Sequence, residues 1–439
     1  MLFAGTAFAQ DNNPGLISGS VISQATQNPL PGITVRVLET NLGAFTDNEG
    51  KFTIKNIPPG TYAVQFTGVG FEKYVQSNVR VTAGRPVSLS VELAEKVIEL
   101  EGAEVRSSYF QKKVETATST QTFNAEDIRR APGVQEDVIR AAALLPGVGV
   151  TQAGRNDLVV RGGAPFENLF IVDDIEVPNI NHFGTQGTSG GPLSLINIDL
   201  VRNVEFSSGG FGARYGDKLS SITNIKLRKG NDQRLGGQAN LSATGVDLIF
   251  EGPAGDDATF FVSARRSYLD FIFDAAGFGF VPEYWDFQAK ADYRLDSKNS
   301  FSFLSIGALG TVRLNNDDPD KRYDNSRVAV PEQKQYFSGL TWKHLFKNGF
   351  SKITLGRTYT SFDIFQNDSN LVEIFSNRSY EGETSLKAEV DFLLSKNFEF
   401  AIGNTVKYAS MLDYDIKLPG FFRLDDQGVP QPYDTDTSM

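Results

Sequence analysis

From about residue 235 onward, apolar and polar side chains alternate along long runs of the chain. Similar alternation surrounds Phe287 and Phe400, and the clearest run interleaves the following residues: Leu386, Ala388, Val390 and Phe392 with Lys387, Glu389 and Asp391. A β-strand places such alternating positions on opposite faces. Runs of about ten residues with one apolar and one charged face are typical of strands in a transmembrane β-barrel.

The connections between these runs alternate between short and long. Tight turns are predicted at 296–299, 347–349 and 395–397, whereas long polar loops are predicted at 270–282, 311–334 and 365–382. Short turns at one end and long loops at the other are a further feature of membrane barrels.

The apolar phase shifts by one residue near Thr244 and Gly245, which predicts a turn or bulge there. With that turn, residues 235–439 contain about nine strands, and a bacterial single-chain barrel has an even number. Residues 435–439 also do not resemble a closing barrel strand. We therefore expect 235–439 to be the N-terminal part of an incomplete antiparallel barrel, and the chain to be a truncated piece of a longer protein.

The first part of the chain has a different pattern. Residues 16–93 contain about seven short runs of alternating apolar residues separated by turn sequences such as Pro58-Pro59-Gly60. This arrangement predicts a small β-sandwich. Residues 1–9 are apolar and end in Ala7-Phe8-Ala9, which predicts the remnant of a secretory signal peptide. A frayed apolar N-terminus is the alternative.

Residues 94–113 are polar and rich in Glu, which predicts a linker. Residues 114–230 combine helical and strand patterns. Asn124 is predicted to cap a short helix with Asp127 three residues later, and a second helical stripe from Val138 stops at Pro146-Gly147. The predicted fold class is therefore mainly β: a β-sandwich, a mixed α/β unit and an incomplete transmembrane barrel.

Composition excludes several classes of function. The chain of 439 residues has a net charge of −11, which argues against nucleic-acid binding. It contains no cysteine and two histidines, His182 and His344, so the usual zinc and thiol sites are excluded. We expect no cofactor and no bound metal.

Motifs for enzymes also fail. Gly210 and Gly212 begin a dinucleotide-like fingerprint, but Tyr215 stands at the third glycine position. His182 is interpreted as a solvated loop residue, with ligand contact as the alternative. The acidic cluster 317–320 is interpreted as an exposed loop rather than a cation site. We therefore expect the protein not to be an enzyme.

Three ordered blocks resemble a known family. Residues 160–163, 168–175 and 209–216 look like the plug domain of TonB-dependent outer-membrane receptors. Residues 16–93 resemble the carboxypeptidase-regulatory-like domain that precedes many such plugs, and residues 263–270 resemble an early barrel strand. The plug-like motif residues are Arg161, Gly162, Gly163, Asp173, Asp174, Gly210, Arg214, Tyr215 and Gly216.

The two motif arginines have a physical interpretation. An Arg beside glycines lets the chain turn sharply while a cation points at a partner. If the plug lies inside a barrel with acidic residues on its inner wall, Arg161 and Arg214 would pair with that wall. Two ordinary surface arginines in glycine turns are the alternative.

The resemblance also implies a TonB box, a segment ahead of the plug that pairs with TonB by strand addition. One candidate is Ala103, Glu104, Val105, Arg106 and Ser107, and Val97-Ile98-Glu99-Leu100 is a second. A plain linker is the alternative for both.

By resemblance, the protein is a receptor in the Gram-negative outer membrane with its N-terminal domain in the periplasm. It takes up a nutrient or metal chelate, driven through TonB by the inner-membrane proton-motive complex. Its expected partners are TonB, outer-membrane lipid and an unidentified extracellular ligand; the substrate-binding residues are not identified. The alternative is a barrel-anchored adhesin or complex scaffold that does not transport.

Overall fold

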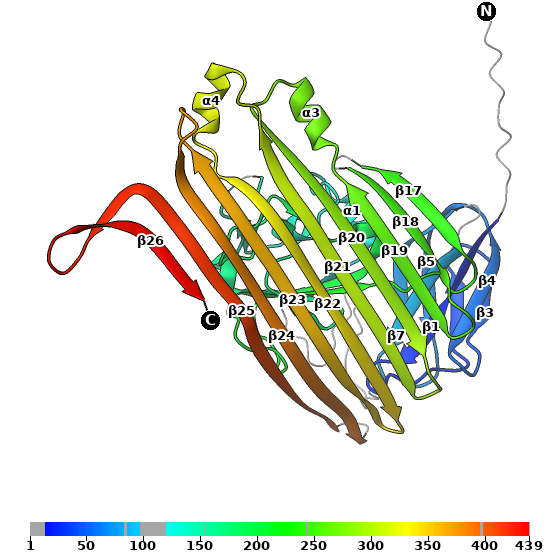
Figure 1. Ribbon diagram of the computed structural model, residues 1–439. Helices are drawn as coiled ribbons and strands as arrows, with labels where there is room; N and C mark the ends of the chain where they lie inside the picture. The colour runs from blue at the N-terminus through cyan, green and yellow to red at the C-terminus, as the bar shows by residue number, and fades with distance from the viewer. Residues whose placement is uncertain are drawn as a thin grey trace, which may run out of the picture.

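The computed structural model describes residues 14–82, 86–96, 120–152, 154–242, 245–395 and 398–438. Figure 1 shows three layers, which we name by residues: the sandwich (14–96), the plug (120–230) and the wall, a ten-stranded sheet (236–438). Strands dominate all three layers, so the expected mainly β fold class is confirmed. The described part contains no helix long and apolar enough to cross a membrane.

The sandwich consists of two sheets packed face to face. One has the order β4-β1-β7, with β1 and β7 parallel, and the other has the order β3-β2-β5-β6. Its alternating apolar residues, among them Val35, Val64 and Phe66, are buried between the sheets. The strands are β1 (Gly15–Ser23), β2 (Thr34–Val37), β3 (Gly43–Phe45), β4 (Lys51–Ile57), β5 (Gly60–Thr67), β6 (Tyr74–Val81) and β7 (Pro86–Leu93).

The plug is built around a five-stranded sheet of order β12-β11-β16-β15-β8, in which β11 and β16 are parallel. Two small hairpins and several short helices surround this sheet. The elements are β8 (Thr120–Phe123), α1 (Ala125–Arg130), α2 (Val138–Ala143), β9 (Val148–Val150), β10 (Leu158–Val160), η1 (Pro165–Glu167), β11 (Asn168–Val172), β12 (Ile175–Val177), β13 (Asn181–His182), β14 (Leu193–Ser194), η2 (Ile198–Leu200), β15 (Val201–Ser207) and β16 (Ser221–Leu227).

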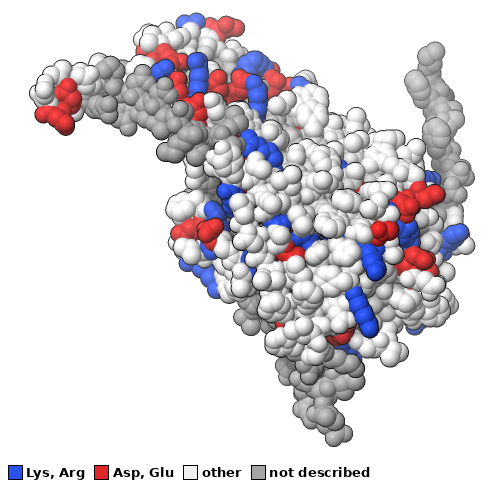
Figure 2. Space-filling view, turned by 60° about the horizontal axis from the view of Figure 1, so that its bottom comes forward, with Lys and Arg blue, Asp and Glu red and all other residues white. Residues whose placement is uncertain are grey.

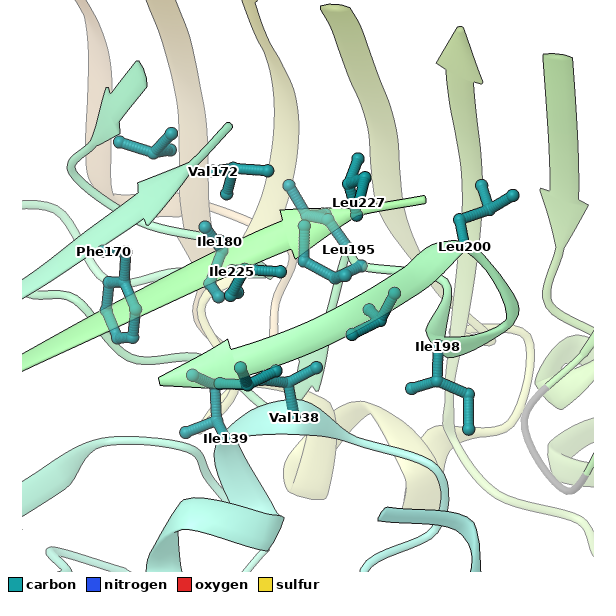
Figure 3. Packing of buried hydrophobic residues seen from close by; sticks show 14 of the residues in the cluster. Val138, Ile139, Phe170, Val172, Ile180, Leu195, Ile198, Leu200, Ile225 and Leu227 are labelled. Carbon is teal, nitrogen blue, oxygen red and sulfur yellow. The ribbon is translucent and has the colours of Figure 1, made fainter. Parts of the chain in front are cut away.

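Capping fixes the two plug helices. Asn124 and Asp127 form the expected capping box at the start of α1. Asp137 caps α2, whose apolar side contributes Val138 and Ile139 to the core beneath the sheet (Figure 3). The core thus holds the helices against the strands that carry the motif residues.

The wall is antiparallel throughout, and each strand pairs with its sequence neighbours. Its strands are β17 (Gly236–Leu241), β18 (Val246–Pro253), β19 (Ala258–Arg266), β20 (Phe280–Arg294), β21 (Asn299–Leu314), β22 (Val330–Phe346), β23 (Gly349–Asn367), β24 (Glu373–Ser395), β25 (Phe398–Leu424) and β26 (Pro430–Ser438). The sheet does not close into a barrel in the described part, where β17 and β26 are its two edges.

The two faces of the wall differ in chemistry. On β20, Asp286, Gln288 and Lys290 point inward, toward the plug, and are buried, whereas Trp285 and Phe287 point outward and are exposed. Figure 2 shows a largely uncharged surface with a dense cluster of acidic and basic side chains at the upper left and further charged side chains scattered below it. An apolar outer face over a polar inner face is the arrangement expected of a membrane barrel.

Three expectations about the wall are corrected. The described wall has ten strands, one more than the expected count of about nine. Residues 435–438 lie in β26 and pair with β25. The three long loops are shorter than expected, because the strands continue beyond the apolar zone and because α3 (Leu269–Ala275) and α4 (Pro319–Asn325) occupy two of them.

The plug lies against the inward face of the wall, and the sandwich lies at its short-turn end (Figure 1). The amide of Asn28 donates to the backbone carbonyl of Phe346, next to a short turn, at 3.3 Å. Asn78 in β6 donates to Asp127 at the start of α1 at 3.0 Å. The sandwich therefore contacts both the wall and the plug.

Candidate functional site

The plug approaches the wall through the tip of the β11–β12 hairpin. Asp173 and Asp174 form its two-residue turn, with φ values of 45° and 73°. Asp tolerates this left-handed conformation better than most residues, and two consecutive positive φ values suit the twist of a hairpin. The turn therefore places two carboxylates side by side at the wall.

Each of these carboxylates binds a lysine of the wall. Asp173 Oδ2 accepts from Lys290 Nζ of β20 at 2.8 Å. Asp174 Oδ1 accepts from Lys352 Nζ of β23 at 2.7 Å and from Lys226 Nζ of β16, within the plug, also at 2.7 Å. The hairpin tip is thus attached to two wall strands.

At the hairpin tip, the neighbouring lysines favour the ionised form of the Asp174 carboxyl group. Burial alone would raise the pKa of the Asp174 carboxyl, but Lys226 and Lys352 beside it hold that pKa well below its usual range. Burial lowers the pKa of Lys226, although Asp174 opposes this change. The carboxylate of Asp174 therefore stays ionised at neutral pH.

Arg214 forms a second ionic contact between the plug and the wall. Its guanidinium donates to Glu389 at 3.3 Å and to Asp391 at 2.6 Å, both on β24. Glu389 also lies 3.4 Å from Lys352, which connects this attachment to the hairpin tip. The expected pairing of Arg214 with an acidic inner wall is present, and its partners lie in the strands at hand.

Arg161 does not share this role. It is exposed, has a φ of 50° and forms no ion pair with any residue in the described ranges. In the described residues, its position fits the alternative interpretation, an ordinary surface arginine in a glycine turn. The pairing expected for Arg161 is not found.

The remaining motif residues shape the plug. Gly162 and Gly210 have φ values of 85° and 67°, where a side chain would be strained. A Cβ at Gly163 would lie 1.7 Å from Ser220 Oγ. Tyr215 packs on the buried cluster of Leu169, Ile171 and Ile222, whereas Gly216 has open space around it.

His182 was expected to be a solvated loop residue, and this expectation is wrong. Its side chain is 1% exposed, its Nε2 lies 2.5 Å from Asp286 Oδ1 of β20, and its ring lies 4.3 Å from that of Tyr284. Asp286 also binds Arg265 Nε of β19 at 2.5 Å. The polar loop around His182 is buried because the wall covers it.

Neutral side chains of the wall hold the same loop by its backbone. Gln333 accepts from the backbone N–H of Gly184 at 3.0 Å, and Gln335 donates to the carbonyl of Asn181 at 2.8 Å. Gln288 donates to the carbonyl of Leu195 at 2.9 Å. These glutamines were not among the predicted site residues, although they alternate with apolar residues and lie on the charged face of the strands.

Two glycines of the wall allow the plug to approach closely. Gly339 of β22 and Gly356 of β23 are directly paired across the sheet, and Ile175 of β12 rests on them. A Cβ at Gly339 would lie 2.5 Å from Ile175 Cδ1, and one at Gly356 would lie 3.4 Å from Ile175 Cγ2. Side chains at these positions would hold the hairpin away from the wall.

Several predicted segments lie outside the described residues. These are the signal remnant 1–9 and both TonB-box candidates, 97–100 and 103–107. Within the described residues, no group of three or more His, Asp or Glu side chains could hold a metal ion. In the acidic cluster, Asp318 caps α4 by accepting from the backbone of Asp320 at 3.1 Å.

Comparison with known protein families matches two parts of the chain. Residues 112–222 match the TonB-dependent Receptor Plug Domain, and residues 16–94 match the Carboxypeptidase regulatory-like domain. The TonB-dependent transporter Oar of Myxococcus xanthus is 26% identical over 251 residues, which cover 53% of this chain and 22% of that protein.

Two solved structures share the fold. The ferric citrate transporter FecA has a TM-score of 0.52 and 14% identity, over 74% of this chain and 51% of that one. A mutant of the ferric enterobactin receptor PfeA of Pseudomonas aeruginosa has a TM-score of 0.51 and 15% identity, over 70% and 50%.

The chain thus spans about a fifth of the curated relative and about half of the solved structures. Both matched domains occur in the expected order, and the wall that follows them has the fold of these receptors. The chain therefore carries a match to the TonB-dependent receptor plug domain after a match to the carboxypeptidase regulatory-like domain, and it is similar to TonB-dependent receptors.

Proposed function

We propose that the protein is an outer-membrane receptor that actively imports a nutrient or metal chelate, with the plug as its gate. The observation that carries the proposal is the ionic attachment of the plug hairpin and Arg214 to the inward face of the wall. A plug held on that face obstructs passive passage, so uptake requires that these contacts be broken and made again.

The charges at this interface suit reversible separation. Asp174 has Lys226 as a second partner within the plug, and Lys352 has Glu389 as a second partner within the wall. When the plug withdraws, each of these charges keeps one partner. The cost of leaving a buried charge uncompensated is therefore reduced.

We propose that TonB supplies the force. A TonB box within 97–107 would pair with TonB by strand addition, and TonB, driven by the inner-membrane proton gradient, would pull on the chain ahead of the plug. Since this segment precedes β8 of the plug sheet in the sequence, tension on it would be transmitted along the chain to that sheet. In this arrangement the sandwich lies in the periplasm.

The ligand would enter from the long-loop end of the wall and reach the buried loop around His182. We propose no specific substrate, and no catalytic step is assigned to the protein. An adhesin or scaffold that does not transport is the competing function, and a mobile plug would be unnecessary for it.

A disulfide lock tests the gate. The chain has no cysteine, and Ile175 and Gly356 lie close enough for the double variant Ile175→Cys/Gly356→Cys to join the plug to the wall. We expect cells that make the double variant to lose uptake of candidate nutrients when an oxidant forms the disulfide. Uptake should recover when a reductant breaks it. Each single variant, treated in the same way, is the matched control.

Uptake that continues through the locked protein would contradict the gate. Deletion of residues 97–107 tests the coupling to TonB, and we expect it to abolish uptake while ligand binding at the cell surface is kept. Unchanged uptake after this deletion would exclude both TonB-box candidates.

A further inference from the structure

The helix α3 lies at the long-loop end of the wall and is attached to its outward face. Asp270 accepts from Arg266 at 2.8 Å, and Asp274 accepts from Arg313 at 2.8 Å. Both arginines are outward residues, since Arg266 pairs with the outward Trp285 and Arg313 pairs with Val281. Val281 is fully buried, and α3 packs on its strand.

Phe271 and Ile272 of α3 face away from the wall, whereas Phe273 contacts Phe280 of β20, with ring centroids 5.4 Å apart. Asp270 and Asp274 are four residues apart and share one side of the helix. Phe271 is 75% exposed and Ile272 is 43% exposed, so both point away from the wall arginines. A surface helix of a water-soluble protein normally buries its large apolar side chains, so the exposure of both Phe271 and Ile272 is unusual for such a helix.

The wall shows the same inversion directly below α3. Aromatic residues form a row on its outward face, where Tyr336 and Tyr359 stack at 5.6 Å and Arg266 lies 5.6 Å from the ring of Trp285. A second row lies toward the short turns, where Phe301 and Trp342 stack at 6.5 Å. Two such rows are characteristic of the two interfaces of a membrane.

Charged pairs mark the edge of this apolar zone. Beyond the first aromatic row, the outward positions carry Lys334 with Glu332 at 3.0 Å and Arg378 with Asp363 at 3.6 Å. The ion pair of Asp274 with Arg313 lies at the same level, because Thr311, two residues before Arg313, pairs with Glu332.

We propose that α3 is an interfacial helix whose Phe271 and Ile272 insert among the acyl chains of the outer-leaflet lipid. Lipid is the occupant because these side chains continue the outward apolar surface of the wall at its aromatic edge. The two ion pairs and the contact of Phe273 with Phe280 hold one side of α3 to the protein, so Phe271 and Ile272 on the other side are presented to the bilayer. The proposal rests on the barrel fold and does not depend on transport.

A single fluorescent label tests this placement. The intact protein carrying Phe271→Cys is labelled with a polarity-sensitive NBD group and reconstituted into dioleoylphosphatidylcholine vesicles that contain phosphatidylcholine with a nitroxide at carbon 5. We expect the nitroxide to quench the label at least twofold more than aqueous iodide does. Phe303→Cys, on the outward apolar face, is the lipid-exposed control, and Tyr323→Cys, on exposed α4, is the water-exposed control.

Quenching by iodide at the level of the Tyr323→Cys control would overturn the proposal. Protection from both quenchers would also overturn it, because the helix would then be covered by another protein or by a second copy. In the Asp270→Asn/Asp274→Asn background, we expect lipid quenching at position 271 to fall at least twofold, with position 303 unchanged. An unchanged signal at 271 would refute the anchoring by the two ion pairs.

Discussion

Asp174 at the tip of the plug hairpin and Lys352 on β23 of the wall lie 2.7 Å apart. Their contact joins residues that are far apart in the sequence and belong to two different layers of the protein. The same carboxylate oxygen also accepts from Lys226 within the plug. The hairpin tip is therefore the point at which the plug is most directly joined to the wall.

Replacing this carboxylate should loosen the plug. In Asp174→Asn, Lys226 loses its carboxylate partner and Lys352 keeps only Glu389, and removal of one member of a largely buried pair costs on the order of 2 kcal/mol. We expect hydrogen exchange in β11 and β12 to be at least tenfold faster. Asp217→Asn, at an exposed plug position with positive φ, is the matched control and should leave exchange unchanged.

The two motif arginines should behave differently. Arg214→Gln leaves Glu389 and Asp391 without their plug partner, so we expect faster exchange across the plug and reduced uptake. Arg161→Gln should change neither, because Arg161 is exposed and forms no ion pair within the described ranges. Equal effects of the two substitutions would contradict the assignment of Arg214 as the anchoring arginine.

In the buried pair of His182 and Asp286, substitution of the two residues should lower the stability of the protein by different amounts. His182→Gln leaves Asp286 paired with Arg265. Asp286→Asn leaves the buried guanidinium of Arg265 without its carboxylate partner at this position, and such a change costs about 3 kcal/mol or more. We therefore expect Asp286→Asn to lower the thermal stability of the plug more than His182→Gln does, measured by calorimetry. The reverse order would show that ring packing dominates.

Acid should loosen the hairpin only at low pH. The folded pKa of Asp174 lies well below its ordinary value of 3.8, so its carboxylate contributes stability above the unfolded pKa and loses it as pH falls through the folded pKa. We expect exchange protection at the hairpin, corrected for intrinsic rates, to stay constant from about pH 7 to about pH 4 and to fall below that. Asp174→Asn should remove part of this fall.

The capping box of α1 predicts a local stability effect. Asn124→Ala removes the acceptor for the backbone N–H groups of Glu126 and Asp127, and loss of such a cap costs about 1 kcal/mol. Asn124→Ser keeps a capping oxygen and should restore most of the loss. Chemical denaturation of the plug would measure both variants.

Local patterns were sufficient to predict much of the fold. The alternation around Phe287 and Leu386 predicted wall strands because one face of each strand is polar and points inward, whereas the other is apolar and points outward. Asn124 and Asp127 predicted the start of α1, because capping depends on residues only three apart. The loop lengths were wrong because strand pairing continues beyond the apolar zone, where the alternation weakens.

The site itself depends on contacts that local patterns do not contain. Arg214 was predicted to meet an acidic wall, but Glu389 and Asp391 were identifiable only once the register of β24 was known. His182 was misjudged because its own segment is polar and rich in glycine, as solvated loops are. Its burial comes from Tyr284 and Asp286 of β20, which are distant in the sequence.

The paired glycines Gly339 and Gly356 have a consequence for the wall if the plug withdraws as proposed. Where Ile175 rested, the wall would expose a flat strip of main chain with no side chain to catch a passing solute. The close contact between Ile175 and the wall, and the unobstructed wall surface after the plug leaves, would then have the same cause: positions 339 and 356 carry no side chain. Gly356→Leu would both hold Ile175 away from the wall and place a side chain in the path of a solute.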